Sequence, residues 1–152
     1  MKYERMPGPL IRAVLDANVL YSATLSPRGL AARVVRSWTD GAFTLVANEI
    51  LVAEFEAAIG RRFAAVPDAA VLTARAAELS ALVLSHAFSV DVPLPAPPRF
   101  RDPNNDHIAQ TAILGRADII VTSDGDLLTL GEVEGIPIVS LHAFALTLGL
   151  TH

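Results

Sequence analysis

The chain has 152 residues, of which 52% are hydrophobic, and it carries 12 Lys and Arg side chains against 16 Asp and Glu, for a formal net charge of −4. This length and apolar content exclude a disordered chain and a second sizeable domain, and the negative charge excludes a general cationic coat for nucleic acid but not a local basic patch. The absence of cysteine excludes disulfides and thiolate sites, so that any metal ion would have oxygen or imidazole ligands.

Residues 1–9 contain an acidic residue and two prolines where a signal peptide would need an apolar run, so we interpret them as an N-terminal tail. One domain is expected to span residues 10–150. Its apolar stretches fall well short of the roughly 20 residues that a membrane helix requires. These features predict a cytoplasmic protein with no membrane partner.

Five short runs rich in β-branched and other apolar residues predict buried strands. In chain order they cover residues 11–15, 43–46, 88–92, 119–122 and 136–139. Helical spacing of apolar residues predicts helices over 29–38, 48–61, 67–86, 104–114 and 141–148. Strands of this kind that alternate with helices predict an α/β fold, with a parallel sheet of about five strands covered on both faces.

Acidic side chains fall at one edge of the predicted sheet, the edge where such sheets bind ligands. Asp16 ends the first strand, and Asp124 and Asp126 follow the fourth. The cluster Arg101-Asp102-Pro103-Asn104-Asn105-Asp106 opens the helix that leads into the fourth strand. Glu54 borders the apolar stripe of its own helix.

Helix capping is the alternative role for most of these acids. Asp102 before Pro103 is typical of an N-cap followed by a first-turn proline, which leaves Asp106 free for a ligand role. For Asp124 and Asp126, capping and chemistry are equally compatible with the sequence. Asp16 has the weakest structural explanation, since a turn aspartate is more often followed by glycine or proline.

Carboxylates that converge on one edge repel one another unless a cation lies between them. Oxygen ligands without cysteine suit Mg²⁺ or Mn²⁺, which often bind substrate phosphate as well. Such ions activate water and stabilise developing charge in phosphodiester hydrolysis. The acids therefore predict a metal site for phosphate chemistry.

Four segments in this order resemble the PIN-domain proteins, specifically the bacterial and archaeal toxins of VapC-like type. They are Leu15-Asp16-Ala17-Asn18-Val19-Leu20, Ile50-Leu51-Val52-Ala53-Glu54-Phe55, the cluster 101–106 and Val121-Thr122-Ser123-Asp124-Gly125-Asp126-Leu127-Leu128. The resemblance runs from about Ile11 to Leu148. It implies a three-layer α/β/α sandwich and a Mg²⁺- or Mn²⁺-dependent endoribonuclease, the toxin of a type II toxin–antitoxin pair. It also implies a homodimer that a small antitoxin holds inactive.

The resemblance assigns roles residue by residue. The catalytic and metal-binding acids would be Asp16, Glu54, Asp106 and Asp124, with Asp126 as a further metal ligand. Asn18 and Ser123 are expected to orient these ligands. The chain departs from the family at Ala17, where Thr is usual, at Gly125, where Lys is common, and at Asn104 and Asn105, which replace frequent acids. Metal binding is expected to survive the loss of the threonine hydroxyl at position 17.

Cationic side chains near the acidic edge are candidates for contact with the RNA backbone. Arginine suits phosphate because its planar guanidinium makes paired hydrogen bonds, and the candidates are Arg61, Arg62 and Arg101. His107 could reach a substrate phosphate, but a solvated place on the helix surface is the expectation for it.

Two other functions compete with a nuclease. One is a PIN-like scaffold that binds RNA or a protein without cutting, against which the retained acids argue. The other is a phosphatase or phospho-acceptor domain that uses Asp16. This chain lacks the second aspartate of Asp-x-Asp phosphatases, because Asn18 stands at that position.

Overall fold

A computed structural model describes residues 10–64, 67–93 and 96–150, so the tail predicted for residues 1–9 lies outside the described residues. Its sheet has six strands in the order β3-β2-β1-β4-β6-β5. Their bounds are β1 Arg12–Leu15, β2 Thr44–Ala47, β3 Phe88–Ser89, β4 Ile119–Thr122, β5 Glu132–Val133 and β6 Ile136–Ser140. The five predicted strands are confirmed, although β3 is shorter than its predicted run.

The strands from β3 to β6 pair in parallel, and only β5 in this sheet is antiparallel to its neighbour. The short strand β5 was not predicted. It forms a hairpin with β6 through Glu134 and Gly135, whose φ angles are 48° and 82°. Two positive φ angles are typical of the tight turn that suits the twist of paired strands.

In the described ranges, seven helices connect and flank the strands. Their bounds are α1 Ala17–Leu25, α2 Leu30–Thr39, α3 Glu49–Phe63, α4 Ala69–His86, α5 Pro103–Leu114, α6 Gly125–Leu130 and α7 Leu141–Thr147. Five of these helices begin at a side-chain cap. Two of the caps are Asn48, which accepts a hydrogen bond from the Leu51 backbone amide, and Ser140, which accepts one from the Ala143 backbone amide. The nine-residue helix α1 was not predicted.

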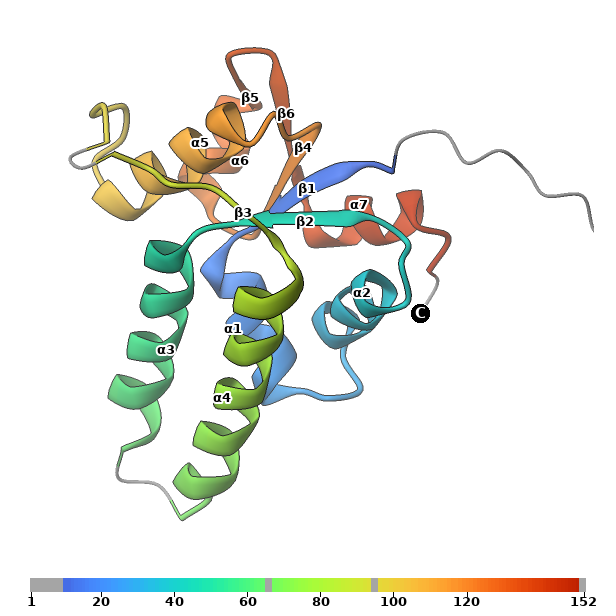
Figure 1. Ribbon diagram of the computed structural model, residues 1–152, viewed down its shortest axis with the longest axis vertical. Coiled ribbons are helices and arrows are strands. Elements are labelled where there is room, and N and C mark those ends of the chain that lie inside the picture. The colour runs from blue at the N-terminus through green and yellow to red at the C-terminus, as the bar shows by residue number, and fades with distance from the viewer. Residues whose placement is uncertain (1–9, 65–66, 94–95, 151–152) are drawn as a thin grey trace, which may run out of the picture.

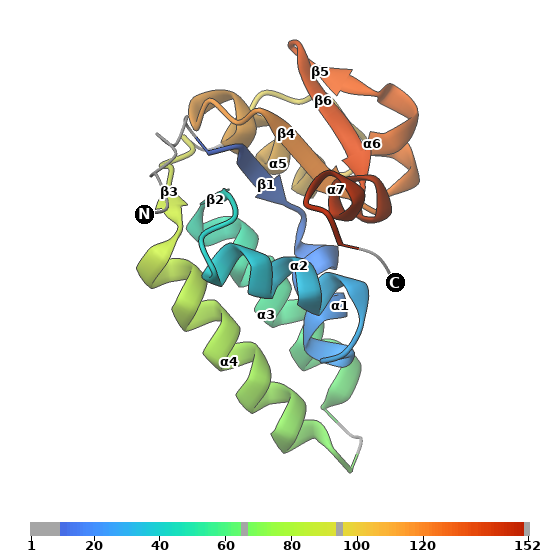
Figure 2. The same ribbon diagram turned by 90° about the vertical axis from the view of Figure 1, so that its right-hand side faces the viewer.

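The direction of the crossovers places the helices in layers. From β1 the chain moves outward to β2 and β3, then returns across the sheet to β4. Because parallel crossovers are right-handed, the return places α5 on the face opposite α2. Figures 1 and 2 show this arrangement, with α7 beside α2 and the α3–α4 pair projecting from the sheet next to α1. The predicted three-layer α/β/α sandwich is confirmed.

The core lies on both faces of the sheet. On the α2 and α7 face, the rings of Phe43 and Phe144 meet edge to face with centroids 5.1 Å apart. Val14, Val46 and Ile120 of the central strands have no exposed surface. Burial on both faces explains why these strands are continuously apolar. Within the described ranges, no helix is both long enough and apolar enough to cross a membrane.

Candidate active site

The candidate site lies where the chain leaves two neighbouring strands in opposite directions. β1 pairs with β4, with Leu15 opposite Val121. After β1 the chain turns toward β2, and after β4 it turns toward β6. Such a switch point leaves a crevice at the carboxyl edge of the sheet. Asp16 directly follows β1, and Asp124 lies two residues after β4. Both therefore lie beside this crevice.

Asp16 is the most enclosed of the acids at this edge. It is 5% exposed and is the N-cap of α1, where Oδ1 accepts a 3.4 Å hydrogen bond from the Asn18 amide. Its Oδ2 accepts a 2.7 Å hydrogen bond from the Thr122 hydroxyl. Burial raises the pKa of Asp16, these hydrogen bonds oppose the rise, and the charge of Asp124 adds to it.

Thr122 is a site residue that sequence reasoning missed. The side chain is fully buried at the end of β4. Its hydroxyl donates to Asp16 and accepts a 2.9 Å hydrogen bond from the Asp124 amide, so it links the two acidic strand ends. A threonine at the end of a strand carries no such signal in the sequence.

Asp124 caps α6, which was one of its two predicted roles. Its Oδ1 accepts hydrogen bonds from the Asp126 amide at 2.7 Å and the Leu127 amide at 3.3 Å. Asp126 itself is exposed, and its Oδ2 lies 3.7 Å from the Arg101 guanidinium. Because both side chains are mostly exposed, this ion pair contributes little to stability.

Glu54 extends the acidic group onto α3. It is half-buried, as its place beside the apolar stripe predicts. Burial raises the pKa of Glu54 to about 7, and the charges of Asp16 and Asp102 add to the rise. Asp102 also caps α5, as predicted, by accepting a 2.9 Å hydrogen bond from the Asn104 amide. Asp102 is thus both a cap and a part of the electrostatic field at Glu54.

Asp106 has a structural role that the sequence did not predict. The side chain is 6% exposed, and its Oδ1 accepts hydrogen bonds from the backbone amides of Arg99 at 2.7 Å and Phe100 at 2.9 Å. These bonds hold the segment before α5 against the helix. Asp106 is not the cap of α5, and its Oδ2 accepts no hydrogen bond within the described residues, so its predicted ligand role stays a prediction.

Four polar residues near the acids differ in how exposed their side chains are. Ser123 and Asn18 are exposed. His107 is half-buried, with its Nδ1 enclosed and unpartnered within the described part of the chain, so the expectation of a solvated histidine is wrong. The side-chain Nδ2 of Asn105 is likewise enclosed and has no acceptor among the described residues. Buried polar atoms without a hydrogen bond are uncommon in proteins, and two of them lie in the first turns of α5.

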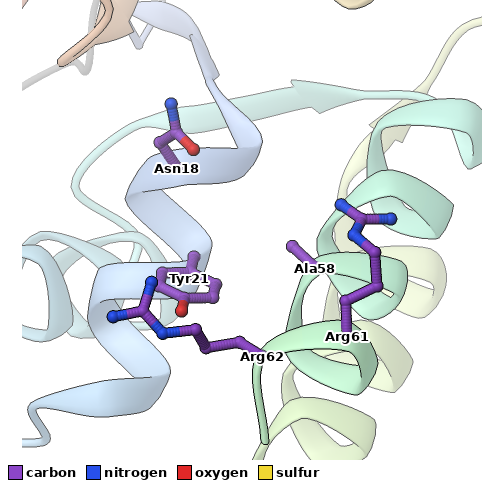
Figure 3. Close-up of a pocket in the computed structure, with 5 residues that line it drawn as sticks. All are labelled: Asn18, Tyr21, Ala58, Arg61 and Arg62. Atoms are coloured by element: carbon purple, nitrogen blue, oxygen red, sulfur yellow. The ribbon is translucent and has the colours of Figure 1, made fainter.

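The predicted RNA-contacting arginines divide into two groups. Arg61 and Arg62, near the end of α3, line a pocket with Asn18 and Tyr21 (Figure 3). Arg101 lies beside Asp126 instead. The cationic side chains therefore flank the acidic edge on two sides.

The acids suit a hard divalent ion in their chemistry, but they do not form a ready-made cage. In residues 10–64, 67–93 and 96–150, no three Asp, Glu or His side chains stand close enough together to hold a metal ion. Asp16 and Glu54 nevertheless have raised pKa values, and neither has an ion pair with a cationic side chain of these residues. Enclosed oxygen donors that lack a counter-charge fit Mg²⁺ or Mn²⁺.

Comparison with known proteins gives a family and a fold. Residues 12–126 match the sequence profile of the PIN domain. No sequence among the curated proteins matches the chain. Among solved structures, the crystal structure of VapBC2 from Rickettsia felis, bound to a DNA fragment from their promoter, is similar with a TM-score of 0.57 and 12% identity. The match covers 86% of this chain and 98% of that chain, and at this identity it establishes the fold alone.

Proposed function

The chain belongs to the PIN domain family, and on this basis we propose that it is a Mg²⁺- or Mn²⁺-dependent endoribonuclease that hydrolyses RNA phosphodiester bonds. The observation that carries this proposal is the pair formed by Asp16, which is buried at the switch point of the sheet, and Glu54, which is half-buried on α3. The charge of Asp16 adds to the cost of ionising Glu54, and no cationic side chain of the described residues pairs with either acid. A site built in this way favours a divalent cation.

Five side chains are proposed to hold the metal, namely Asp16, Glu54, Asp106, Asp124 and Asp126. When bound, such an ion lowers the pKa of water and stabilises negative charge that develops on the phosphate. The hydrogen bonds of Asp16, Asp106 and Asp124 occupy Oδ1 in each, which orients the carboxylates. The remaining oxygens of Asp106 and Asp124 accept no hydrogen bond from the described residues, so they are available as ligands.

Further side chains are proposed to orient the site and its substrate. Burial raises the pKa of Glu54 to about 7 in the metal-free protein, and a bound cation would favour its charged form, so we propose Glu54 as a ligand. The Thr122 hydroxyl fixes Asp16 by donating to Oδ2. We propose that Asn18 and Ser123, next to the acids in the sequence, orient ligands or water. Arg61, Arg62 and Arg101 are proposed to bind the RNA backbone.

The proposed biological role is the toxin of a type II toxin–antitoxin pair. The structural similarity to VapBC2 from Rickettsia felis supports this role and a small antitoxin as a partner. We also propose a homodimer that acts in the cytoplasm. Light scattering of the protein, alone and after co-expression with the product of any short neighbouring reading frame, tests both associations.

A cleavage assay tests the enzyme function. The purified chain should degrade RNA when Mg²⁺ or Mn²⁺ is added, and EDTA should stop the reaction. Asp16→Asn should abolish cleavage, whereas Asp91→Asn, a change at an exposed acid outside the site, should leave it intact. Equal cleavage by wild type and Asp16→Asn would show that the proposed site is wrong.

Two substitutions separate the structural and metal-binding roles of Asp106. Asp106→Asn keeps an oxygen for the amides of Arg99 and Phe100, so it should weaken Mn²⁺ binding in calorimetry without lowering the metal-free melting temperature. Asp106→Ala should lower both. If wild type itself binds no Mn²⁺, the alternative of a non-catalytic PIN-like module that binds RNA or protein is favoured.

A further inference from the structure

A pocket of about 450 Å³ lies between α1 and α3, next to the acidic edge. Its lining residues are Asn18, Tyr21, Ala58, Arg61 and Arg62 (Figure 3). Asn18 follows Asp16 by two residues, so one end of the pocket adjoins the proposed catalytic acids. The volume lies within the range of pockets that bind small organic ligands. None of the lining side chains is acidic.

The two arginines of this pocket have no counter-ion among the residues that the structure describes. Neither Arg61 nor Arg62 has an ion pair or hydrogen bond within the described residues. By contrast, Arg99 is held by Glu134 at 2.6 Å, and Arg101 lies 3.7 Å from Asp126. Of the arginines near the acidic edge, those of the pocket are therefore the ones available to an anion.

The geometry of the pocket suits a phosphodiester. Figure 3 shows Arg62 extending from α3 toward Tyr21 of α1, while Arg61 extends along α3 toward the level of Asn18. Guanidinium groups bind phosphate through paired, charge-assisted hydrogen bonds. In Figure 3 the two guanidinium groups point away from each other on either side of Ala58, so each of them can bind a different phosphate of one strand.

Tyr21 gives this pocket an anchored aromatic wall. Its ring stacks on that of Phe63, with centroids 6.1 Å apart and planes 27° from parallel. Because the ring is held by this packing, little side-chain entropy is lost when a ligand contacts it. The phenol hydroxyl can donate a hydrogen bond to a phosphate oxygen.

We propose that this pocket is a subsite for single-stranded RNA, in which Arg61, Arg62 and the Tyr21 hydroxyl bind phosphates of the strand next to the bond that is cleaved. The assignment rests on the proposed ribonuclease function, because the pocket takes its substrate from the adjoining acids. Arg101 is not part of this subsite. The RNA strand then passes from the switch point of the sheet onto the groove between α1 and α3.

The test is RNA binding by the full chain without metal, so that no cleavage occurs. Fluorescence anisotropy with a labelled oligouridylate, at increasing KCl, compares wild type with Arg61→Gln/Arg62→Gln and with Arg28→Gln/Arg116→Gln, which removes the same charge at two exposed positions outside the pocket. The pocket double variant should bind about tenfold more weakly or worse. The slope of log affinity against log salt should also fall by about 0.7 for each phosphate that the variant no longer neutralises. The control double variant should change far less on both measures.

Further variants test the aromatic wall and the nature of the ligand. Tyr21→Phe keeps the stack on Phe63 and should weaken RNA binding about threefold or more, as expected when one hydrogen bond to a charged group is removed. An oligoglutamate peptide of equal charge should compete poorly with the RNA. If it competes as well as unlabelled RNA does, the pocket is a general anion site and the assignment is overturned.

The outcomes separate this inference from the proposed function. If wild type cleaves RNA with Mn²⁺ but the two double variants bind RNA equally, the subsite is wrong and the ribonuclease stands. If wild type binds RNA without metal through Arg61 and Arg62 but never cleaves it, the subsite stands and the enzyme function fails. Absence of RNA binding by wild type overturns the subsite.

Discussion

Thr122 controls how the acids are presented, since one hydroxyl contacts both Asp16 and the backbone of Asp124. Thr122→Val keeps the shape of the side chain but leaves the Asp16 carboxylate without this donor. We expect the metal-free free energy of unfolding to fall by about 1.5–3 kcal/mol, the range for a hydrogen bond to a charged group. Urea denaturation in EDTA measures the loss.

Thr147→Val is the matched control. Its hydroxyl bonds to the Ala143 carbonyl at 3.2 Å on an exposed helix surface. This change should cost less than about 0.5 kcal/mol, as is usual for exposed positions. Equal losses in the two variants would show that Asp16 does not depend on the Thr122 hydroxyl.

Glu54 predicts the pH dependence of the metal-free protein. Folding raises the pKa of Glu54 from 4.5 to about 7. An acid with a raised pKa favours the folded state while it is protonated, so the stability present below pH 4.5 is lost as pH rises through 7. The pKa of Asp16 is raised too and acts with the same sign. The melting temperature in EDTA should therefore fall between these pH values.

Substitutions on α3 test the source of this fall. Glu54→Gln should flatten the decline, because its side chain does not ionise. Glu56→Gln, an exposed change on the same helix, should leave the profile as in wild type. A decline of the same size in Glu54→Gln would contradict the assignment to Glu54.

At the level of elements, substitution of two helix glycines by alanine should change the free energy of unfolding in opposite directions. Gly60 lies within α3 with open space where a Cβ would be, so Gly60→Ala should stabilise the protein by about 0.5–1 kcal/mol. A Cβ at Gly115, the C-cap of α5, would overlap Val46 and lie 2.9 Å from the Thr111 carbonyl. Gly115→Ala should therefore cost about 1–3 kcal/mol. Thermal denaturation of both variants decides, and equal effects would contradict this packing.

The elements that could be predicted from the sequence are those with a strong pattern of their own. The central strands were predicted because burial on both faces makes them continuously apolar, and α5 because Asp102 and Pro103 mark its start. The helix α1 was missed because it begins directly after β1. Its cap, Asp16, was interpreted only as a strand-end acid. The strand β5 has two residues, too few for any periodicity to show.

For the candidate site, the sequence predicted which acidic residues are involved and that they lie at the carboxyl edge of the sheet. Tertiary contacts decide the rest. The bonds from Asp106 to the amides of Arg99 and Phe100 depend on how a loop folds back on α5. The bond between Thr122 and Asp16 joins side chains 106 positions apart in the sequence. No local pattern encodes either contact.

For the whole molecule, we expect metal binding to raise the free energy of unfolding. The chain carries a formal charge of −4, and a divalent ion would relieve part of the repulsion at the acidic edge. An ion that binds only the folded state stabilises it by about 4 kcal/mol at a thousandfold excess over its dissociation constant. Mn²⁺ should thus raise the melting temperature of wild type and of Asp91→Asn. The same rise in Asp16→Asn would exclude Asp16 as a ligand.

The pairing of β1 with β4 has a consequence for the order of events during synthesis. Residues 12–15 leave the ribosome early, but their partner strand spans residues 119–122. Contacts so distant in sequence form late, since the intervening chain must fold first or be held in place. Asp16 and Asp124 therefore cannot come together on a nascent chain until most of it has emerged. Translation products that end before residue 122 therefore lack the assembled acidic edge.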